Sequence, residues 1–214
     1  MNFAPAIYNG KPKIKNIIFD WGGVITNLHF DNTRKAFQDL GLDIFSESMV
    51  HDPNHMLFIP FEIGAITPDE FRNNIRNLFA TPLSDSTIDE AWNAMLGDLP
   101  AERWSILEQV RKKYRTFILS NTNAIHVSYY FNRIQQKFGT YGYSHLFEKI
   151  YFSFELGLRK PDEAIFRYVL KDAGLDPAKT LFIDDFVENI QTARELGFQT
   201  VHLQAPLTLT DVFV

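Results

Sequence analysis

Short apolar strands alternate with helices over much of the 214-residue chain, and this alternation is the feature that most constrains the fold. The candidate strands are the runs 14–19, 116–120, 149–152, 180–184 and 199–203, and the helices between them are expected at 101–114, 161–173 and 188–196. Strands that alternate with helices form parallel sheets with right-handed crossovers. The sequence therefore predicts the α/β class, with helices on both faces of a parallel sheet.

The alternation is interrupted between residues 28 and 99, where helical signals dominate and no convincing strand appears. The segment Thr67-Pro68-Asp69-Glu70 is a strong helix start, because it combines a capping threonine, proline at the first helical position and an acid at capping-box spacing. A second helix is expected over residues 84–96. We interpret residues 28–99 as a compact helical insert, with residues 1–27 and 100–214 forming the core.

Composition excludes several classes of function. The chain has 21 basic and 26 acidic residues, a net charge of −5, and we see no basic stripe that would suit a nucleic acid or a membrane surface. It has no cysteine, which excludes disulfides, thiolate metal sites and a cysteine nucleophile. No apolar run approaches the roughly 20 residues of a membrane helix, and the N-terminus lacks the apolar core of a signal peptide. We expect a cytoplasmic protein.

Polar residues with chemical potential follow the first two core strands. Asp20 ends the first strand and is followed by Gly22 and Gly23, so its carboxylate is expected at the edge of the sheet as a nucleophile. Ser120 and Asn121 end the next core strand, where a hydroxyl and turn amides can hold phosphate oxygens. Each pattern alone is also ordinary turn chemistry, so neither decides the function by itself.

Two further strand ends carry charge. Lys160 precedes Pro161 at an expected helix start, where it would neutralise a phosphate, although an exposed loop lysine is the alternative. Asp184 and Asp185 follow a buried strand, and two adjacent acids there repel each other unless a cation lies between them. Mg²⁺ takes such oxygen ligands. A helix N-cap would explain one of these acids but not both.

Asp, Ser, Lys and Asp-Asp, in this order at four strand ends, resemble the motifs of the haloacid dehalogenase (HAD) superfamily. The resemblance covers most of residues 14–203 and suggests a Rossmann-like core with a helical cap inserted after the first strand. It is closest to the subgroup that contains bacterial sugar-phosphate phosphatases and the N-terminal phosphatase domain of soluble epoxide hydrolase. The segments that carry it are Leu119–Asn123 with His126, Leu156–Pro161, Phe182–Asp185 with Asn189, and Phe61–Phe71.

The resemblance implies a Mg²⁺-dependent phosphohydrolase for a small phosphorylated metabolite, with sugar phosphates as candidates. Asp20 would attack phosphorus and become an aspartyl-phosphate. The metal would be held by Asp20, the Gly22 carbonyl and Asp185, with Asp184 binding directly or through water. The phosphate would be bound by Gly22, Gly23, Ser120, Asn121 and Lys160, with Asn189 supporting the acidic loop. Monomer and homodimer both stay open.

The chain departs from the family pattern at Gly22, where the family usually has a second Asp that transfers protons. One interpretation is a substrate with an easily expelled leaving group, such as an anomeric sugar 1-phosphate. Another is an acid from elsewhere, with His29, Asp31 and Glu62 as candidates. A third is a slow or non-catalytic phosphate-binding protein. Metal-free 2-haloacid dehalogenases also lack this Asp, but they have no reason to keep paired acids at the fourth motif.

Three other groups of residues allow a functional and a structural interpretation. His126 is expected either to touch substrate or to be a polar residue at a helix start. His51 and His55 suggest a metal pair only weakly, because no further ligand is spaced near them. The aromatic run Tyr129–Phe131 is typical of packing. The cap is expected to close over Asp20, which would exclude water and supply specificity.

Overall fold

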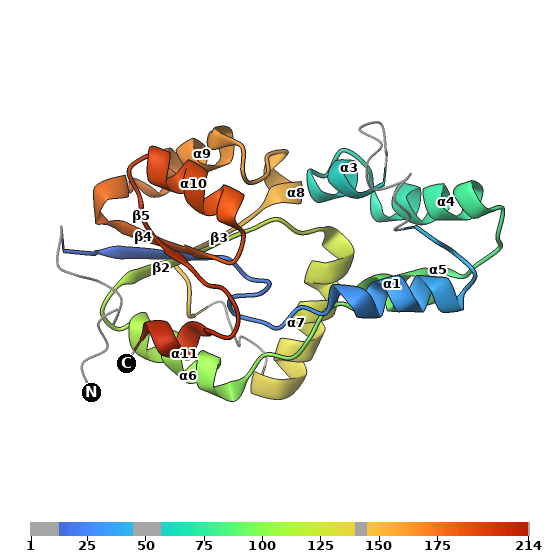
Figure 1. Cartoon of the computed structure of the whole chain (residues 1–214), viewed down its shortest axis with the longest axis horizontal. Coiled ribbons are helices and arrows are strands. Elements are labelled where there is room, and N and C mark those ends of the chain that lie inside the picture. The colour runs from blue at the N-terminus through green and yellow to red at the C-terminus, as the bar shows by residue number, and fades with distance from the viewer. Residues whose placement is uncertain (1–12, 45–56, 140–144, 214) are drawn as a thin grey trace.

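Figure 1 shows the computed structural model, which describes residues 13–44, 57–139 and 145–213. Five parallel strands form one sheet in the order β3-β2-β1-β4-β5. They are β1 (Asn16–Phe19), β2 (Arg115–Ser120), β3 (Lys149–Phe152), β4 (Thr180–Asp184) and β5 (Gln199–His202). The α/β class and the parallel sheet expected from the sequence are confirmed.

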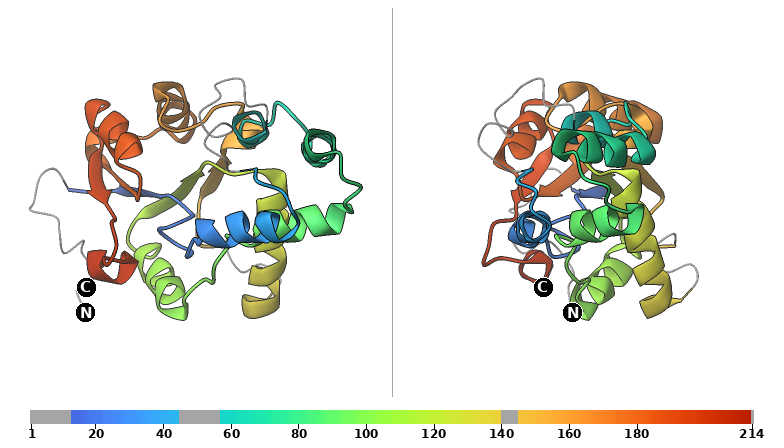
Figure 2. Two further views of the ribbon diagram at one scale, coloured as in Figure 1. Left: turned by 45° about the vertical axis from the view of Figure 1, so that its right-hand side comes forward. Right: turned by 90° about the vertical axis from the view of Figure 1, so that its right-hand side faces the viewer.

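Helices cover both faces of this sheet (Figures 1 and 2). One face carries α9 (Glu163–Ala173) and α10 (Val187–Glu195), and the other carries α6 (Ala101–Val110), α7 (Ala124–Phe138) and α11 (Leu209–Val212). Neighbouring strand residues point to opposite faces. Ile18 and Phe182 therefore pack toward α9 and α10, whereas Ile17 and Ile183 belong to the core on the other face.

Within the described residues, four helices lie beyond one end of the sheet, on the right of Figure 1. They are α1 (Phe30–Asp39), α3 (Phe58–Glu62), α4 (Pro68–Phe79) and α5 (Asp85–Asn93). The described part of residues 28–99 contains no strand beyond one isolated bridge between Leu28 and Leu96. The helical texture read from the sequence there agrees with this arrangement.

The chain enters and leaves these four helices through two segments that lie side by side. The Asn27 amide donates to the Asp98 carbonyl (3.0 Å), and the His29 amide donates to the Met95 carbonyl (2.8 Å). Gly97 lies close to Asn27, since a Cβ on Gly97 would come within 2.6 Å of the Asn27 carbonyl oxygen. The two crossings therefore form one connection between the helices and the sheet.

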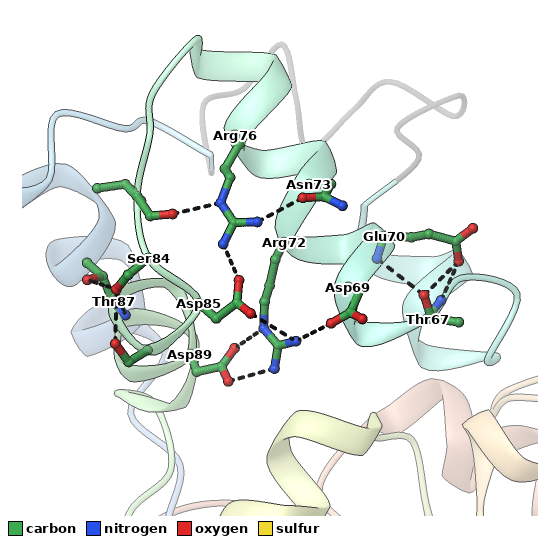
Figure 3. A network of polar contacts seen from close by, with 12 residues as sticks. Thr67, Asp69, Glu70, Arg72, Asn73, Arg76, Ser84, Asp85, Thr87 and Asp89 are labelled. Carbon is green, nitrogen blue, oxygen red and sulfur yellow. Dashed lines mark hydrogen bonds and ion pairs between the residues drawn. The ribbon is translucent and has the colours of Figure 1, made fainter.

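A polar network joins α4 to α5 (Figure 3). Arg72 donates to both carboxylate oxygens of Asp89, each at 2.8 Å, and to Asp69 at 2.8 Å. Arg76 pairs with Asp85. At the start of α4 the predicted capping box is present, since the Glu70 amide donates to the Thr67 hydroxyl and the Thr67 amide donates to the Glu70 carboxylate. These contacts hold α4 against α5.

Some expected boundaries were wrong. The helix predicted at 161–173 begins at Glu163, because the Asp162 side chain caps it by accepting from the Ala164 amide (2.8 Å). The helix predicted at 84–96 ends at Asn93. His51 and His55 lie outside the described residues. No helix in the described ranges is long and apolar enough to cross a membrane.

Candidate active site

The carboxyl ends of three neighbouring strands meet at one edge of the sheet. Strand β1 lies between β2 and β4, with Phe19 opposite both Ile118 and Ile183. Asp20 follows β1, and its amide donates to the Ile183 carbonyl at 2.9 Å. This topology brings Asp20 between the strand ends that carry Ser120 and Asp184, as parallel strands do at a ligand-binding edge.

Lys160 is buried between two of these acids. Its ammonium lies 2.9 Å from Asp20 and 2.6 Å from Asp184, and its side chain is 1% exposed. Asn121 holds the lysine backbone, since its Oδ1 accepts from the Lys160 amide (2.9 Å) and its Nδ2 donates to the Lys160 carbonyl (2.8 Å). Burial disfavours the ammonium, but the two carboxylates outweigh it and raise the pKa of Lys160. Lys160 therefore keeps its positive charge.

Both carboxylate oxygens of Asp184 accept hydrogen bonds. Besides Lys160, it accepts from the Phe186 amide (2.8 Å) and from the Asn189 side chain (2.9 and 3.1 Å). Asn189 thus supports this acid directly. The arrangement holds Asp184 as a fixed, fully buried carboxylate.

Asp185 contrasts with its neighbour. Its Oδ1 is buried and has no hydrogen-bond partner within the described chain. Its Oδ2 faces Gly23, where a Cβ would come within 2.2 Å and where the backbone φ of +77° already favours glycine. Oxygen atoms of Asp20, Asp184 and Asp185 lie within 4.8 Å of one another. A buried carboxylate oxygen without a donor, in such a cluster, fits a hard cation such as Mg²⁺.

Burial and the neighbouring charges together explain the pKa shifts of Asp20 and Asp185. Burial raises the pKa of Asp20 to about 7; Lys160 opposes this shift, and Asp184 and Asp185 add to it. Burial and then Asp184 raise the pKa of Asp185 to about 6. A divalent cation would lower both pKa values, because it favours the ionised carboxylates.

A cavity of about 430 Å³ lies over these residues. Six of the site residues predicted from the sequence line its base: Asp20, Gly22, Ser120, Asn121, Lys160 and Asn189. Apolar side chains from α1, α3 and α5 complete its wall, among them Phe30, Phe58 and Trp92. Gly23 is not on this wall and instead contacts Asp185.

The space beside Gly22 is occupied. A Cβ at this position would come within 2.6 Å of Leu28 Cδ1 and 3.2 Å of Leu28 Cγ. The side chain that usually transfers protons in the resembling family is thus replaced by an apolar contact. Of the three alternative acids, Glu62 lines the cavity and pairs with Arg159 at 2.9 Å, whereas neither His29 nor Asp31 lines it.

His126 and Tyr130 have structural partners although both line the cavity. The His126 ring stacks on Trp92 with centroids 5.0 Å apart, and its Nε2 donates to the Trp92 carbonyl at 3.3 Å. The Tyr130 hydroxyl lies 2.9 Å from that of Thr26. Both residues therefore serve packing, and His126 additionally presents its ring to the cavity.

Several wall residues carry no signal in the sequence that marks them as functional. Arg159 was visible only as a neighbour of Lys160, and Glu188 only as part of a helix start. Phe58 and Trp92 carry no local signal, because their place depends on how the helices of residues 28–99 pack over the sheet. Only the closure of this segment over Asp20 was expected.

Comparison with known proteins agrees with this geometry. A family model described as haloacid dehalogenase-like hydrolase matches residues 14–197. The chain belongs to this family. The resemblance inferred from the sequence motifs is therefore confirmed.

Individual relatives cover nearly the whole chain. D-ribitol-5-phosphate phosphatase from Bacteroides thetaiotaomicron is 33% identical over 87% of this chain and 90% of its own length. A sesquiterpene phosphatase from Aspergillus oryzae is 28% identical over 88% of this chain and 89% of its own length. A HAD family enzyme from Bacteroides thetaiotaomicron, solved in complex with magnesium and inorganic phosphate, superposes with a TM-score of 0.87 at 37% identity, covering 94% of this chain and 100% of that one.

Proposed function

We propose that this chain is a Mg²⁺-dependent phosphatase that hydrolyses a small phosphomonoester through an aspartyl-phosphate on Asp20. The observation that carries the proposal is the cluster at the cavity base, in which Lys160 lies 2.9 Å from Asp20 while Asp185 keeps a buried oxygen without a donor. The relative named as a D-ribitol-5-phosphate phosphatase and the relative solved with magnesium and phosphate support it.

The chemistry divides into two displacements. The Asp20 carboxylate attacks phosphorus, the bond between phosphorus and the leaving oxygen breaks, and this oxygen takes a proton from water as the alcohol departs. Water then attacks the acyl phosphate and releases inorganic phosphate and free Asp20. Ser120 and the amides near Asn121 bind the phosphoryl oxygens, and Lys160 neutralises charge on Asp20 and the phosphate. Catalysis of this kind rests on positioning and electrostatic stabilisation.

The residues that would hold the metal are Asp20, Asp185 and the Gly22 carbonyl, with Asp184 direct or through water. When bound, Mg²⁺ supplies positive charge that neutralises the phosphate and the repelling acids. The unpartnered oxygen of Asp185 favours this chemistry over that of a metal-free dehalogenase, which has no use for a further buried acid.

We assign residues 28–99 to the cap and residues 1–27 and 100–214 to the core. The paired crossings at residues 27–29 and 95–98 suit a hinge, and the cavity lies between wall residues from both parts. Closure of the cap would exclude water from Asp20.

The test is Mg²⁺-dependent release of phosphate from p-nitrophenyl phosphate, whose leaving group needs no general acid. We expect Asp20→Asn to reduce turnover at least about 1000-fold, as loss of a covalent nucleophile does. Asp31→Asn is the matched control, because Asp31 is exposed and does not line the cavity. Equal activity of the wild type and Asp20→Asn would refute the catalytic assignment and leave a phosphate-binding protein.

A further inference from the structure

The proposed function leaves the class of the leaving alcohol open, and the cavity wall bears on it. Away from the cluster around Asp20, the described wall is formed largely by apolar side chains from residues 28–99 and from Phe186, the residue before α10. They are Leu28, Phe30, Phe58, Trp92, Met95, Leu96 and Phe186. A polyol presents hydroxyl groups to its site, and such a wall offers them few partners.

Two of these side chains are exposed although they are large and apolar. Phe30 is 53% exposed and Phe186 is 48% exposed, and both line the cavity. Burial of apolar surface is favourable in proportion to its area. An apolar ligand that covers these rings therefore gains binding free energy that a polyol would not.

Aromatic rings form a continuous stack along the wall. Phe58 stacks on Trp92 with centroids 5.4 Å apart and planes inclined by 7°, and Trp92 stacks on His126 with centroids 5.0 Å apart and planes inclined by 19°. Burial lowers the pKa of His126, so this ring is neutral near pH 7. The stacked rings of Phe58, Trp92 and His126 therefore add uncharged lining to the cavity.

Most polar side chains on the described wall are already committed to the protein. Asn121 exchanges hydrogen bonds with the Lys160 backbone, and Asn123 accepts from the His126 amide (3.1 Å). Glu62 and Arg159 pair with each other. A hydroxyl-rich substrate would therefore meet few polar side chains that are not already hydrogen-bonded, and a buried hydroxyl left unpaired costs free energy.

We infer that the substrate of this site is the monophosphate of an apolar alcohol, with a hydrocarbon chain or ring. This inference rests on the proposed function and specifies its substrate class. The phosphate lies at Asp20, and the hydrocarbon lies against Phe30, Phe58 and Trp92. Leu28, which lies beside Gly22, extends this apolar wall toward the phosphate end of the substrate.

A series of n-alkyl phosphates from ethyl to octyl tests the inference directly, assayed with Mg²⁺ on the full chain. The leaving alcohols are nearly equally basic, so chain length changes binding rather than chemistry. We expect kcat/KM to rise by up to about fourfold per added methylene until the wall is covered. Hexyl phosphate should exceed glucitol 6-phosphate, which has the same carbon number, by at least about 100-fold.

Variants locate the effect on the wall. Phe58→Gln should reduce the preference for hexyl over ethyl phosphate by at least about tenfold, through KM. Ile59→Gln is the matched control and should leave the preference unchanged, because Ile59 is the next residue of α3, is 53% exposed and does not line the cavity. Phe30→Gln, at the exposed first residue of α1, gives a second variant should Phe58→Gln fail to fold.

The possible failures are distinguishable. If kcat/KM does not rise with chain length, or glucitol 6-phosphate is preferred, the apolar class is wrong, while Mg²⁺-dependent and Asp20-dependent turnover of ethyl phosphate still supports the proposed function. If Phe58→Gln and Ile59→Gln behave alike, the aromatic wall is not the binding surface. If no phosphomonoester is hydrolysed, the inference fails together with the proposed function.

Discussion

At the scale of single residues, Leu28 fills the space beside Gly22, where the family usually has an aspartate that transfers protons. A Cβ on Gly22 would lie 2.6 Å from the Leu28 Cδ1 atom. The clash is with the end of a flexible side chain, so an added carboxylate would displace Leu28 at a cost in packing. A side chain added at Gly22 is therefore expected to push Leu28 aside.

Replacing both residues should restore the missing chemistry. We expect Gly22→Asp alone to lower the free energy of unfolding by about 1–3 kcal/mol, as overpacking does, and Leu28→Ala beside it to relieve part of this loss. The double variant should hydrolyse ethyl phosphate at least about tenfold faster than the wild type, because a positioned acid contributes to catalysis. Urea unfolding and phosphate release measure the two effects. A single variant as stable as the wild type would disprove the steric argument.

His126 should make stability depend on pH. Burial lowers its pKa to about 4, whereas an unfolded histidine has a pKa near 6.5. Between these values the unfolded chain binds a proton that the folded chain does not, so stability is full above pH 6.5 and falls as the pH drops toward 4. The loss amounts to at most about 3 kcal/mol.

Denaturant unfolding of the wild type and His126→Gln over pH 4–7 measures this contribution. The variant should lose less stability on acidification, since glutamine does not titrate and can still donate to the Trp92 carbonyl. Parallel pH profiles for the two proteins would show that His126 does not carry the effect.

At the scale of elements, local signals were the most predictable. The capping box at Thr67 was readable because its partners are three residues apart, and all five strands were found because each is a short apolar run between turns. The start of α9 was misjudged because the side chain of Asp162 caps the helix after Pro161. The bounds of helix α7 are not readable from the sequence, since its buried His126 and Tyr130 obscure the apolar periodicity.

The Arg72 network should stabilise the helices of residues 28–99. Arg72 is 15% exposed and makes two hydrogen bonds to Asp89, so Arg72→Met leaves a partly buried acid without its partner. We expect a loss of about 1–3 kcal/mol in the free energy of unfolding. Lys35→Met is the control, because the Lys35–Asp39 pair is 74% and 66% exposed and should contribute below about 0.5 kcal/mol. Equal effects of the two substitutions in urea unfolding would contradict this difference.

At the scale of the whole molecule, the base of the site was predictable and its wall was not. Asp20, Ser120, Lys160 and the acid pair are each tied to a strand end or the loop after it, and parallel topology alone brings such ends to one edge. The wall depends on how α3 and α5 pack across the cavity from the sheet, a long-range arrangement without a local signal at Phe58 or Trp92. The role of Leu28 beside Gly22 was hidden for the same reason.

Metal binding should stabilise the folded chain. Burial, and then repulsion from Asp184, raise the pKa of Asp185 to about 6. We expect Mg²⁺ at about 100 times its Kd to raise Tm by roughly 5 °C, and EDTA to reverse the shift. Asp185→Asn should have a higher Tm than the wild type without metal, since the repulsion is reduced, and should lose the Mg²⁺ response. A Mg²⁺ shift that persists in this variant would place the metal elsewhere.

The central claim is that Asp20 becomes phosphorylated, and acetyl phosphate tests it most directly. Its leaving group needs no acid, so phosphorylation of Asp20 is expected to be fast. Hydrolysis of the aspartyl-phosphate is expected to be slow, because Gly22 carries no side chain that could act as a base. The account predicts that protein quenched during turnover with Mg²⁺ carries one added phosphoryl group, and that peptide mapping by mass spectrometry locates it on Asp20. Phosphate release from acetyl phosphate without any phosphorylated Asp20, or with release undiminished in Asp20→Asn, would contradict the account.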